Sequence, residues 1–167
     1  MVYRNKTYVC FDGDSDIHYY RLMQAWHQSD HTQFNFYNAH ELNRARDTSL
    51  ESSIKRQLRE RLLNTKVFVV LIGEKTRYLY KFVRWEMEQA LSLDLPVIGV
   101  NLNGLRSQDA DRCPPIIKNE VAIYIRFNAR ILQHALETWP REHAFQRTSQ
   151  ATGPFFYDRD VYKRLGL

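Results

Sequence analysis

The sequence predicts an α/β protein with a flavodoxin-like, three-layer fold. Strand-like and helix-like segments alternate along the 167 residues, and the run KVFVVLIG (66–73) is continuously apolar and rich in β-branched residues. Such runs are typical of strands that are buried on both faces of a parallel sheet. The alternation indicates right-handed β-α-β crossovers. We therefore expect five strands in a mostly parallel sheet of order 2-1-3-4-5, with helices on both faces.

The first three elements follow from short patterns near the N-terminus. TYVCF (7–11) is an apolar run that stops at the turn residues DGDSD, as a strand followed by a loop does. IHYYRLMQAW (17–26) has the length and composition of a helix, with Ser15 or Asp16 available as its N-cap. QFNFYN (33–38) alternates polar and aromatic residues, which is typical of an edge strand.

A helix is predicted over residues 49–63. Thr48 is followed three residues later by Glu51, which is the pattern of a capping box. Apolar residues then repeat every four positions, as expected for the buried stripe of an amphipathic helix: Leu50, Ile54, Leu58 and Leu62.

The chain beyond the buried run at 66–73 continues the alternation. YKFVRWEMEQALSL (80–93) predicts a helix and PVIGVNL (96–102) a strand, while residues 102–115 predict an irregular connection. VAIYIRF (121–127) predicts the fifth strand.

The last predicted helix, ARILQHALETW (129–139), is expected to end at Pro140, because proline lacks the N–H that would continue the helix. We divide the chain there into an α/β domain, residues 1–140, and an aromatic-rich C-terminal extension, residues 141–167. The aromatic composition of the extension argues against disorder. We expect it to pack on the domain or on a partner subunit.

Composition excludes several classes of protein. The net charge of +5 permits anionic partners, but the basic residues are scattered and their densest group, 54–62, forms the solvated side of a helix, so nucleic acid is not an expected partner. No apolar run approaches the ~18 residues that cross a bilayer, and the N-terminus lacks a signal peptide. Cys10, Cys113 and the six histidines show no metal-ligand spacing. We expect a cytoplasmic protein without a bound metal or membrane contact.

Several familiar sites are also excluded by their missing motifs. The chain has no GxxxxGK[ST] phosphate loop, no GxGxxG fingerprint and no GxSxG nucleophile elbow. A phospho-receiver domain needs an aspartate at the end of the third strand and a lysine at the end of the fifth. Gly73 or Glu74 and Phe127 or Asn128 occupy those places, so this hypothesis fails.

The loops after the first and third predicted strands are the expected ligand site. In open parallel sheets, ligands bind beyond the carboxyl ends of the strands, where the strand order reverses. Gly13 in the first of these loops allows close backbone approach, and Asp12, Asp14 and Asp16 carry charge. The aspartates also suit turn formation and helix capping, which is the better explanation for Asp16.

Glu86 is a carboxylate at the margin of the apolar stripe of its predicted helix. At ~100° per residue it lies ~60° from the centre of that stripe, and about two turns, roughly 12 Å, inside the helix. Arg84 and Glu88 point away from the stripe. Partial desolvation at such a margin raises the pKa of a carboxyl group toward the range useful for acid–base chemistry. Geometry alone leaves two interpretations open, a catalytic carboxylate or a boundary glutamate bound by a neighbouring arginine.

The segment FVVLIGEKT…KFVRWEMEQAL closely resembles the TIR-like domain family DUF1863 (MTH538), which includes the TIR protein of the Thoeris anti-phage system. The matching positions are Ile72-Gly73, Glu74-Lys75-Thr76 and Val83-Arg84-Trp85-Glu86-Met87. The HYYRLMQAW helix and the FNFYN strand resemble the family too. The resemblance covers about residues 6–102 and leaves the tail unmatched.

The resemblance implies that the protein has a TIR-like fold. It also implies an enzyme that uses NAD as its substrate and needs no cofactor. In NAD-cleaving TIR domains a glutamate on this helix is catalytic, and it maps onto Glu86. Phe82 stands where the family usually carries tryptophan, but an aromatic ring for stacking is kept. Trp85 forms either a second wall of the pocket or a subunit contact. The residues expected to bind substrate are Phe11, Asp12, Gly13, Asp14, Tyr37, Phe82 and Trp85, with Tyr37 and the loop to Asp47 as a gate.

By the same resemblance, the reaction is cleavage of the nicotinamide–ribose bond, which is akin to glycoside cleavage. The implied product is a cyclic or conjugated ADP-ribose-type signal that activates a downstream effector in anti-phage defence. The enzyme is expected to form a homo-oligomer or to await a trigger. Two alternatives stay open: a non-enzymatic TIR-type signalling or interaction module, and a nucleoside-processing transferase that ignores NAD.

Overall fold

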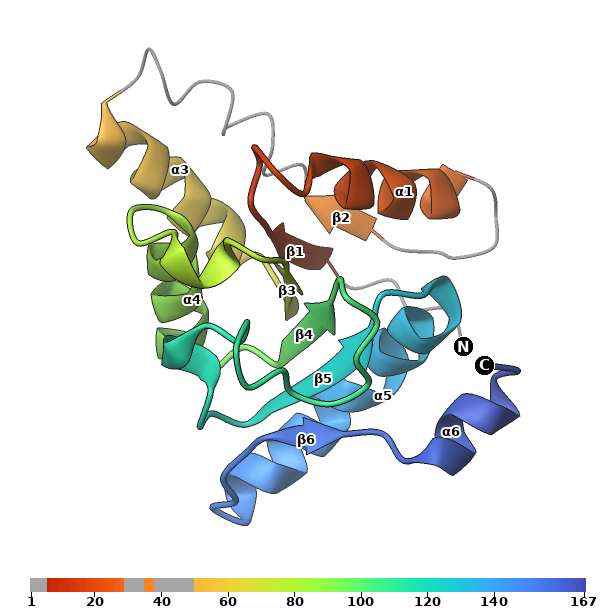
Figure 1. The fold of residues 1–167 in the computed structure, drawn as a ribbon. Helices are drawn as coiled ribbons and strands as arrows, with labels where there is room; N and C mark the ends of the chain where they lie inside the picture. The colour runs from red at the N-terminus through yellow and green to blue at the C-terminus, as the bar shows by residue number, and fades with distance from the viewer. Residues whose placement is uncertain (1–5, 29–34, 38–49) are drawn as a thin grey trace.

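The computed structural model describes residues 6–28, 35–37 and 50–167. Within these residues six strands form one sheet of order β2-β1-β3-β4-β5-β6, between two helical layers (Figure 1). All neighbouring strands run parallel. The strands are β1 (Lys6–Cys10), β2 (Asn35–Tyr37), β3 (Val67–Ile72), β4 (Val97–Asn101), β5 (Ala122–Arg126) and β6 (Phe155–Phe156).

The predicted flavodoxin-like α/β fold and the strand order 2-1-3-4-5 are confirmed, and the structure adds one strand. The two residues of β6 pair with Ile123 and Tyr124 of β5. A strand of two residues is too short to show a period in the sequence. Gly153 lets the chain pass close to β5, because a Cβ at this position would lie 1.9 Å from the carbonyl oxygen of Glu120.

The centre of the sheet is β3, which was predicted from its continuous apolar run. All of its residues are buried, and it pairs with β1 on one side and β4 on the other. A strand covered by helices on both faces has no solvated side. This explains why the sequence shows no polar alternation there.

Helices cover both faces of the sheet (Figure 1). Strand residues alternate between two apolar clusters, so that Val9 of β1 packs on the side of α1 and α5, whereas Tyr8 and Cys10 pack on the side of α3 and α4. The helices are α1 (Ile17–Gln28), α3 (Glu51–Leu63), α4 (Val83–Ser92), α5 (Ala129–Thr148) and α6 (Arg159–Arg164), with the 3₁₀ turns η2 (Thr76–Tyr78) and η3 (Pro115–Ile117).

The predicted capping box does not begin α3. The N-cap residue is Leu50, whose side chain cannot accept a hydrogen bond, and Thr48 lies outside the described residues. Glu51 instead pairs with Lys55 one turn later, at 2.8 Å. The apolar stripe is confirmed at Ile54, Leu58 and Leu62, which are fully buried, but not at Leu50, which is 77% exposed.

The prediction that the last long helix ends at Pro140 is wrong, because α5 continues through this residue to Thr148. Proline removes one backbone donor from a helix. The turns beyond it make contacts that offset this loss. His143 is buried, and Arg147 Nε lies 2.9 Å from an Asp94 carboxylate oxygen at the end of α4. Pro140 therefore lies inside α5. The division of the chain into a domain, 1–140, and an extension, 141–167, stays a prediction.

The segment after α5 packs on the same face of the sheet as α1 and α5. Tyr157 and Tyr162 are buried in that apolar cluster. The Tyr162 hydroxyl accepts a hydrogen bond from the Arg126 backbone N–H at 3.3 Å. Arg130 Nη1 donates to the Leu165 carbonyl oxygen at 3.0 Å. The tail is thus attached to the end of β5 and the start of α5.

Candidate active site

The chain leaves β1 and β3 toward opposite faces of the sheet. After β1 it enters α1, and after β3 it passes through η2 into α4 on the other face (Figure 1). Since these two strands are neighbours, the loops 11–16 and 73–82 meet at the carboxyl edge of the sheet. This is the place where open parallel sheets bind ligands.

Asp12 organises the loop after β1. Its carboxylate accepts hydrogen bonds from the backbone N–H groups of Asp14, at 3.0 Å, and Ser15, at 3.3 Å. Its carbonyl oxygen accepts from Asp16 N–H at 2.9 Å. Asp12 is buried, whereas Asp14 is exposed and Gly13 is half-buried. The turn-forming role expected of these aspartates therefore belongs to Asp12.

Asp16 precedes α1 but does not cap it in the way that was expected. One of its carboxylate oxygens, Oδ2, is buried and has no hydrogen-bond partner in the described part of the chain. The carboxylate lies against Gly73 at the end of β3, where a Cβ would fall 2.3 Å from Oδ2. Burial raises the pKa of Asp16, and Asp12 adds to the rise. Gly73 therefore leaves the space that this carboxylate fills.

The loop after β3 is closed by one hydroxyl group. Thr76 Oγ1 accepts a hydrogen bond from Gly73 N–H at 2.9 Å and donates to the Leu71 carbonyl oxygen at 3.3 Å. The chain then runs through η2 and a turn before α4 begins at Val83. The predicted helix start at residue 80 is therefore three residues too early.

Glu86 lies in the first turn of α4, not two turns inside a helix as predicted. Its side chain is 2% exposed, so it is more deeply buried than the expected margin position. Its backbone N–H donates to the Phe82 carbonyl oxygen at 2.8 Å. The N-terminus of a helix stabilises a nearby negative charge. The Cys10 thiol, 3.9 Å from the Val83 carbonyl oxygen, places this turn beside the end of β1.

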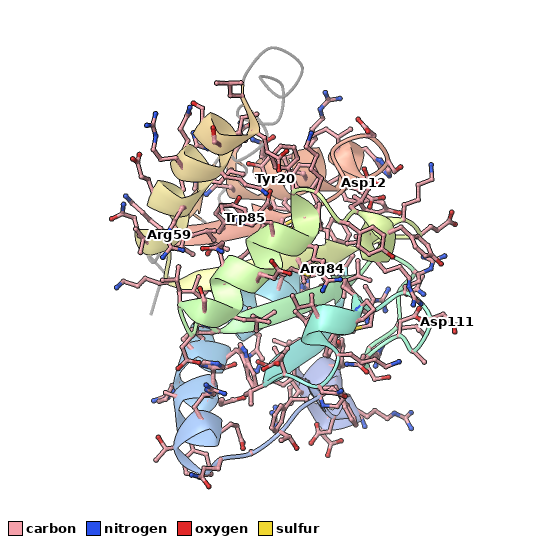
Figure 2. The ribbon with its side chains drawn as sticks, turned by 90° about the vertical axis from the view of Figure 1, so that its left-hand side faces the viewer. Asp12, Tyr20, Arg59, Arg84, Trp85 and Asp111 are labelled. Carbon is pink, nitrogen blue, oxygen red and sulfur yellow. The ribbon has the colours of Figure 1, made fainter. Side chains whose placement is uncertain are left out.

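The neighbours of Glu86 on α4 have different environments. Arg84 bonds to Glu88 one turn later, with its Nε 3.1 Å from the carboxylate, and both side chains are exposed. Trp85 is half-buried and lies on the side of α4 that faces α3 (Figure 2). Lys55 of α3 approaches its ring to 5.5 Å. Trp85 thus joins two helices within one chain.

The structure brings some of the predicted substrate residues together and separates others. Phe82, at 8% exposure, directly precedes α4 and shares its first turn with Trp85 and Glu86. Phe11 lies on the other face of the sheet, where its ring stacks on Tyr20 of α1 at 4.8 Å. Tyr37 ends β2, but its side chain and the loop to Asp47 lie outside the described residues.

A pocket opens beside α1, at the carboxyl ends of β1, β3 and β4, between the two loops that the sequence predicted as the ligand site. We call it the α1-side pocket. It has a volume of about 290 Å³, and Glu86 is not among its lining residues. Its lining includes Asp16, His18, Tyr19, Lys75, Leu102 and Arg112. The loops after β1 and β3 were expected here, whereas the contributions of His18, Tyr19, Leu102 and Arg112 depend on contacts between segments that are distant in sequence.

Arg112 is held in this pocket by the connection after β4. Asp109 accepts hydrogen bonds from the backbone N–H groups of Asp111, at 2.8 Å, and Arg112, at 2.9 Å. Burial alone would raise the pKa of Asp109, but these hydrogen bonds outweigh it and lower the pKa. The Arg112 guanidinium reaches Glu74 at 3.4 Å. The irregular connection therefore positions a cation above the end of β3.

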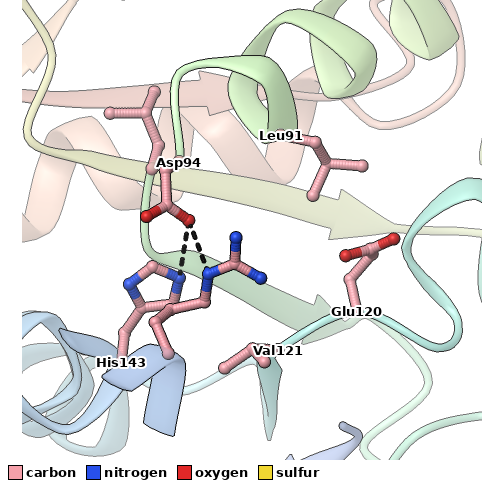
Figure 3. Close-up of a pocket in the computed structure, with 7 residues that line it drawn as sticks. Leu91, Asp94, Glu120, Val121 and His143 are labelled. Atoms are coloured by element: carbon pink, nitrogen blue, oxygen red, sulfur yellow. Dashed lines mark ion pairs between the residues drawn. The ribbon is translucent and has the colours of Figure 1, made fainter. Parts of the chain in front are cut away.

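A second hollow lies between the end of α4 and α5 and is too small for a substrate. Its volume of about 30 Å³ suits no more than a water molecule or two. Asp94 faces His143, at 3.8 Å, and Arg147, at 2.9 Å, across it (Figure 3). Burial lowers the pKa of His143, although Asp94 opposes this effect. These contacts fasten two helices together.

Within residues 6–28, 35–37 and 50–167, no three His, Cys, Asp or Glu side chains are grouped so that they could hold a metal ion. Across the same ranges, every helix is too short or too polar to span a membrane.

Comparison with protein families shows what the chain is similar to. Residues 8–107 match the model of the family described as Thoeris protein ThsB, TIR-like domain. The matched range runs from β1 past β4 and includes the loop after β1, the loop after β3 and Glu86. No curated protein matches the chain.

Proposed function

The chain belongs to the family of Thoeris ThsB TIR-like domains, and on this premise we propose that it cleaves NAD with Glu86 as its catalytic residue. NAD is the substrate, and the reaction needs no further cofactor. The product is an ADP-ribose-type signal, cyclic or conjugated, that activates an effector protein in anti-phage defence.

The observation that carries this proposal is the position of Glu86. Glu86 is 2% exposed, lies in the first turn of a helix, and belongs to the segment that follows β3, beside the strand β1 from which the chain leaves toward the other face of the sheet. A glutamate without a chemical role more often lies on the surface, as Glu88 does on the same helix. Burial in a water-poor place strengthens the electrostatic effect of a carboxylate on a developing positive charge.

The chemistry requires only one carboxylate. When the bond between nicotinamide and ribose breaks, its electron pair leaves with nicotinamide, which becomes neutral and needs no general acid. The ribose carbon is left with oxocarbenium character, which Glu86 stabilises while it holds a ribose hydroxyl group. Water, or a nucleophile of ADP-ribose or of an acceptor, then attacks this carbon and loses a proton.

The burial of Glu86 also bears on the timing of the reaction. At 2% exposure the carboxylate cannot touch a ribose until neighbouring side chains move. Many enzymes complete their site in such a conformational step. This supports an enzyme that rests in a closed state and works after assembly or a trigger.

The proposal is tested by the release of nicotinamide from NAD, with and without extract of phage-infected cells. We expect Glu86→Gln to lower the rate at least ~100-fold, since it removes the charge that stabilises the transition state. Glu88→Gln is the matched control, because this glutamate is exposed on the same helix and pairs with Arg84. It should leave the rate unchanged.

Two results would contradict the proposal. Equal nicotinamide release by Glu86→Gln and the wild type would remove Glu86 from the chemistry. No NAD turnover by the wild type under any condition, combined with loss of defence when Trp85 is changed, would favour a TIR-type interaction module instead.

A further inference from the structure

The α1-side pocket lies at the position where open parallel sheets bind ligands, but on the side of the sheet away from α4. Its lining comes from the segments after β1, β3 and β4. Its volume of about 290 Å³ is at the low end for ligand sites, which span ~300–1,000 Å³. A ligand of this size is a mononucleotide rather than a dinucleotide.

Asp16 gives the pocket a hydrogen-bond acceptor. Its side chain is 7% exposed, and its Oδ2 has no hydrogen-bond partner in the described residues. A buried polar atom without a partner costs about 1–3 kcal/mol. Asp16 also lines the pocket, so a ligand hydroxyl group that donates to its carboxylate would supply the kind of partner that Oδ2 lacks. In dinucleotide-binding folds with this kind of sheet, one acidic side chain accepts a hydrogen bond from a ribose hydroxyl group.

Arg112 and Lys75 give the pocket an anion-binding side. Arg112 pairs with the carboxylate of Glu74 across the pocket, at 3.4 Å, and the Glu74 side chain is 78% exposed. Exposed ion pairs of this kind contribute little to stability, so a phosphate can replace Glu74 as the partner of Arg112. A guanidinium binds phosphate through two parallel hydrogen bonds, and a lysine adds a point charge.

Tyr19 gives the pocket an aromatic wall. Its ring is fixed by an edge contact with Phe127, at 5.0 Å between centroids, and by His18, at 4.1 Å. Both Tyr19 and His18 line the pocket. An immobilised aromatic ring is a surface on which a nucleobase can pack, whichever base it is.

We propose that the α1-side pocket is a second ligand site, which binds a nucleoside monophosphate. The ribose hydroxyl groups bond to Asp16, the phosphate binds Arg112 and Lys75, and the base packs against Tyr19. Glu86 takes no part, so this site does not depend on the proposed cleavage of NAD.

The test is isothermal titration of the full chain with adenosine 5′-monophosphate and, separately, with inorganic phosphate. We expect Asp16→Asn and Arg112→Gln each to weaken binding of the nucleotide at least ~10-fold, which is the effect of one lost charged hydrogen bond. Asp160→Asn and Arg164→Gln are matched controls, because both residues are exposed on α6. These controls and Glu86→Gln should bind as the wild type does.

Three outcomes would overturn the proposal. The first is no binding of the nucleotide by the wild type at millimolar concentration. The second is binding that Glu86→Gln abolishes while Arg112→Gln and Asp16→Asn retain it, since the nucleotide would then lie on the α4 side. The third is equal affinity for inorganic phosphate and the nucleotide, because the pocket would then recognise an anion without a ribose.

Discussion

Asp16 illustrates how a single residue can oppose the stability of the fold that contains it. Its carboxylate is buried against Gly73 with an unsatisfied oxygen, close to a second acidic side chain, Asp12. His18 and Arg112 lower its pKa in part, but burial outweighs them and the net shift is upward. Compared with the unfolded chain, the folded state therefore disfavours the charged form of Asp16.

The free energy of unfolding should respond to this residue in a pH-dependent way. When folding raises the pKa of a carboxyl group, the group stabilises the folded state at any pH below its pKa in the unfolded chain. This stabilisation is lost as the pH rises through its pKa in the folded state. We expect Asp16→Asn to stabilise the protein by about 1 kcal/mol at pH 7, since it removes a buried charge. This gain in the free energy of unfolding should shrink as the pH falls toward 3.8, the ordinary pKa of an aspartate.

Denaturant unfolding of both proteins between neutral and acidic pH measures this difference. Asp14→Asn is the control, because Asp14 is an exposed residue of the same loop and should give no comparable gain. A gain for Asp16→Asn that is equal at all pH values would contradict the account. Lower stability of this variant at pH 7 would contradict it as well.

At the scale of single elements, α5 contains a proline where the sequence pattern predicts an end. Pro140 lies in the interior of the helix, whereas Pro115 is at the start of η3, where no backbone donor is needed. We expect Pro140→Ala to raise the free energy of unfolding by about 1–2 kcal/mol, because it restores a helical hydrogen bond at some cost in unfolded-state entropy.

The measurement is again denaturant unfolding, with Pro115→Ala as the matched control. The control should be neutral or slightly destabilising, since proline suits its position. A loss of stability for Pro140→Ala would contradict this expectation and would show that the proline is needed for the contacts of His143 and Arg147 with Asp94.

Elements that depend on local patterns were predicted from the sequence, and features that depend on distant contacts were not. The apolar run of β3 and the four-residue repeat of α3 each bury one continuous surface, so their composition alone reveals them. The start of α4 at Val83 depends on the turn fixed by Thr76, which shifted the helix away from the predicted residue 80. Glu86 therefore lies in the first turn of α4 and not two turns inside it.

The proposed site at Glu86 and the α1-side pocket also differ in whether local sequence patterns reveal them. Glu86 could be found because its helix carries a local motif. Asp16 could not be distinguished from a capping residue, since its burial depends on Gly73, which is distant in sequence. Arg112 reaches the α1-side pocket only because Asp109 folds the irregular connection back over β3. No residue spacing in the sequence reports such a contact.

At the scale of the whole molecule, the tail beyond the matched family range completes the sheet and one apolar layer. Tyr162 is fully buried, and its hydroxyl accepts a hydrogen bond from the backbone of Arg126. We expect Tyr162→Ala to lower the free energy of unfolding by about 3–5 kcal/mol, as for other large buried aromatic side chains. Tyr162→Phe should cost only about 1 kcal/mol, the value of one hydrogen bond.

Thermal and denaturant unfolding measure both changes. Tyr80→Ala is the control, because Tyr80 is 64% exposed and should change stability by no more than about 0.5 kcal/mol. If Tyr162→Ala were as stable as the wild type, the tail would be an appendage of the fold and not a part of its core.

The central claim is that Glu86 acts on the ribose of NAD, and a crystal structure with a non-cleavable NAD analogue tests it most directly. We predict that the side chains over Glu86 move and that its carboxylate lies within about 2.6–3.2 Å of a hydroxyl of the nicotinamide ribose. The claim would be contradicted by an analogue whose nicotinamide ribose binds away from Glu86, for example in the α1-side pocket, while the carboxylate remains buried.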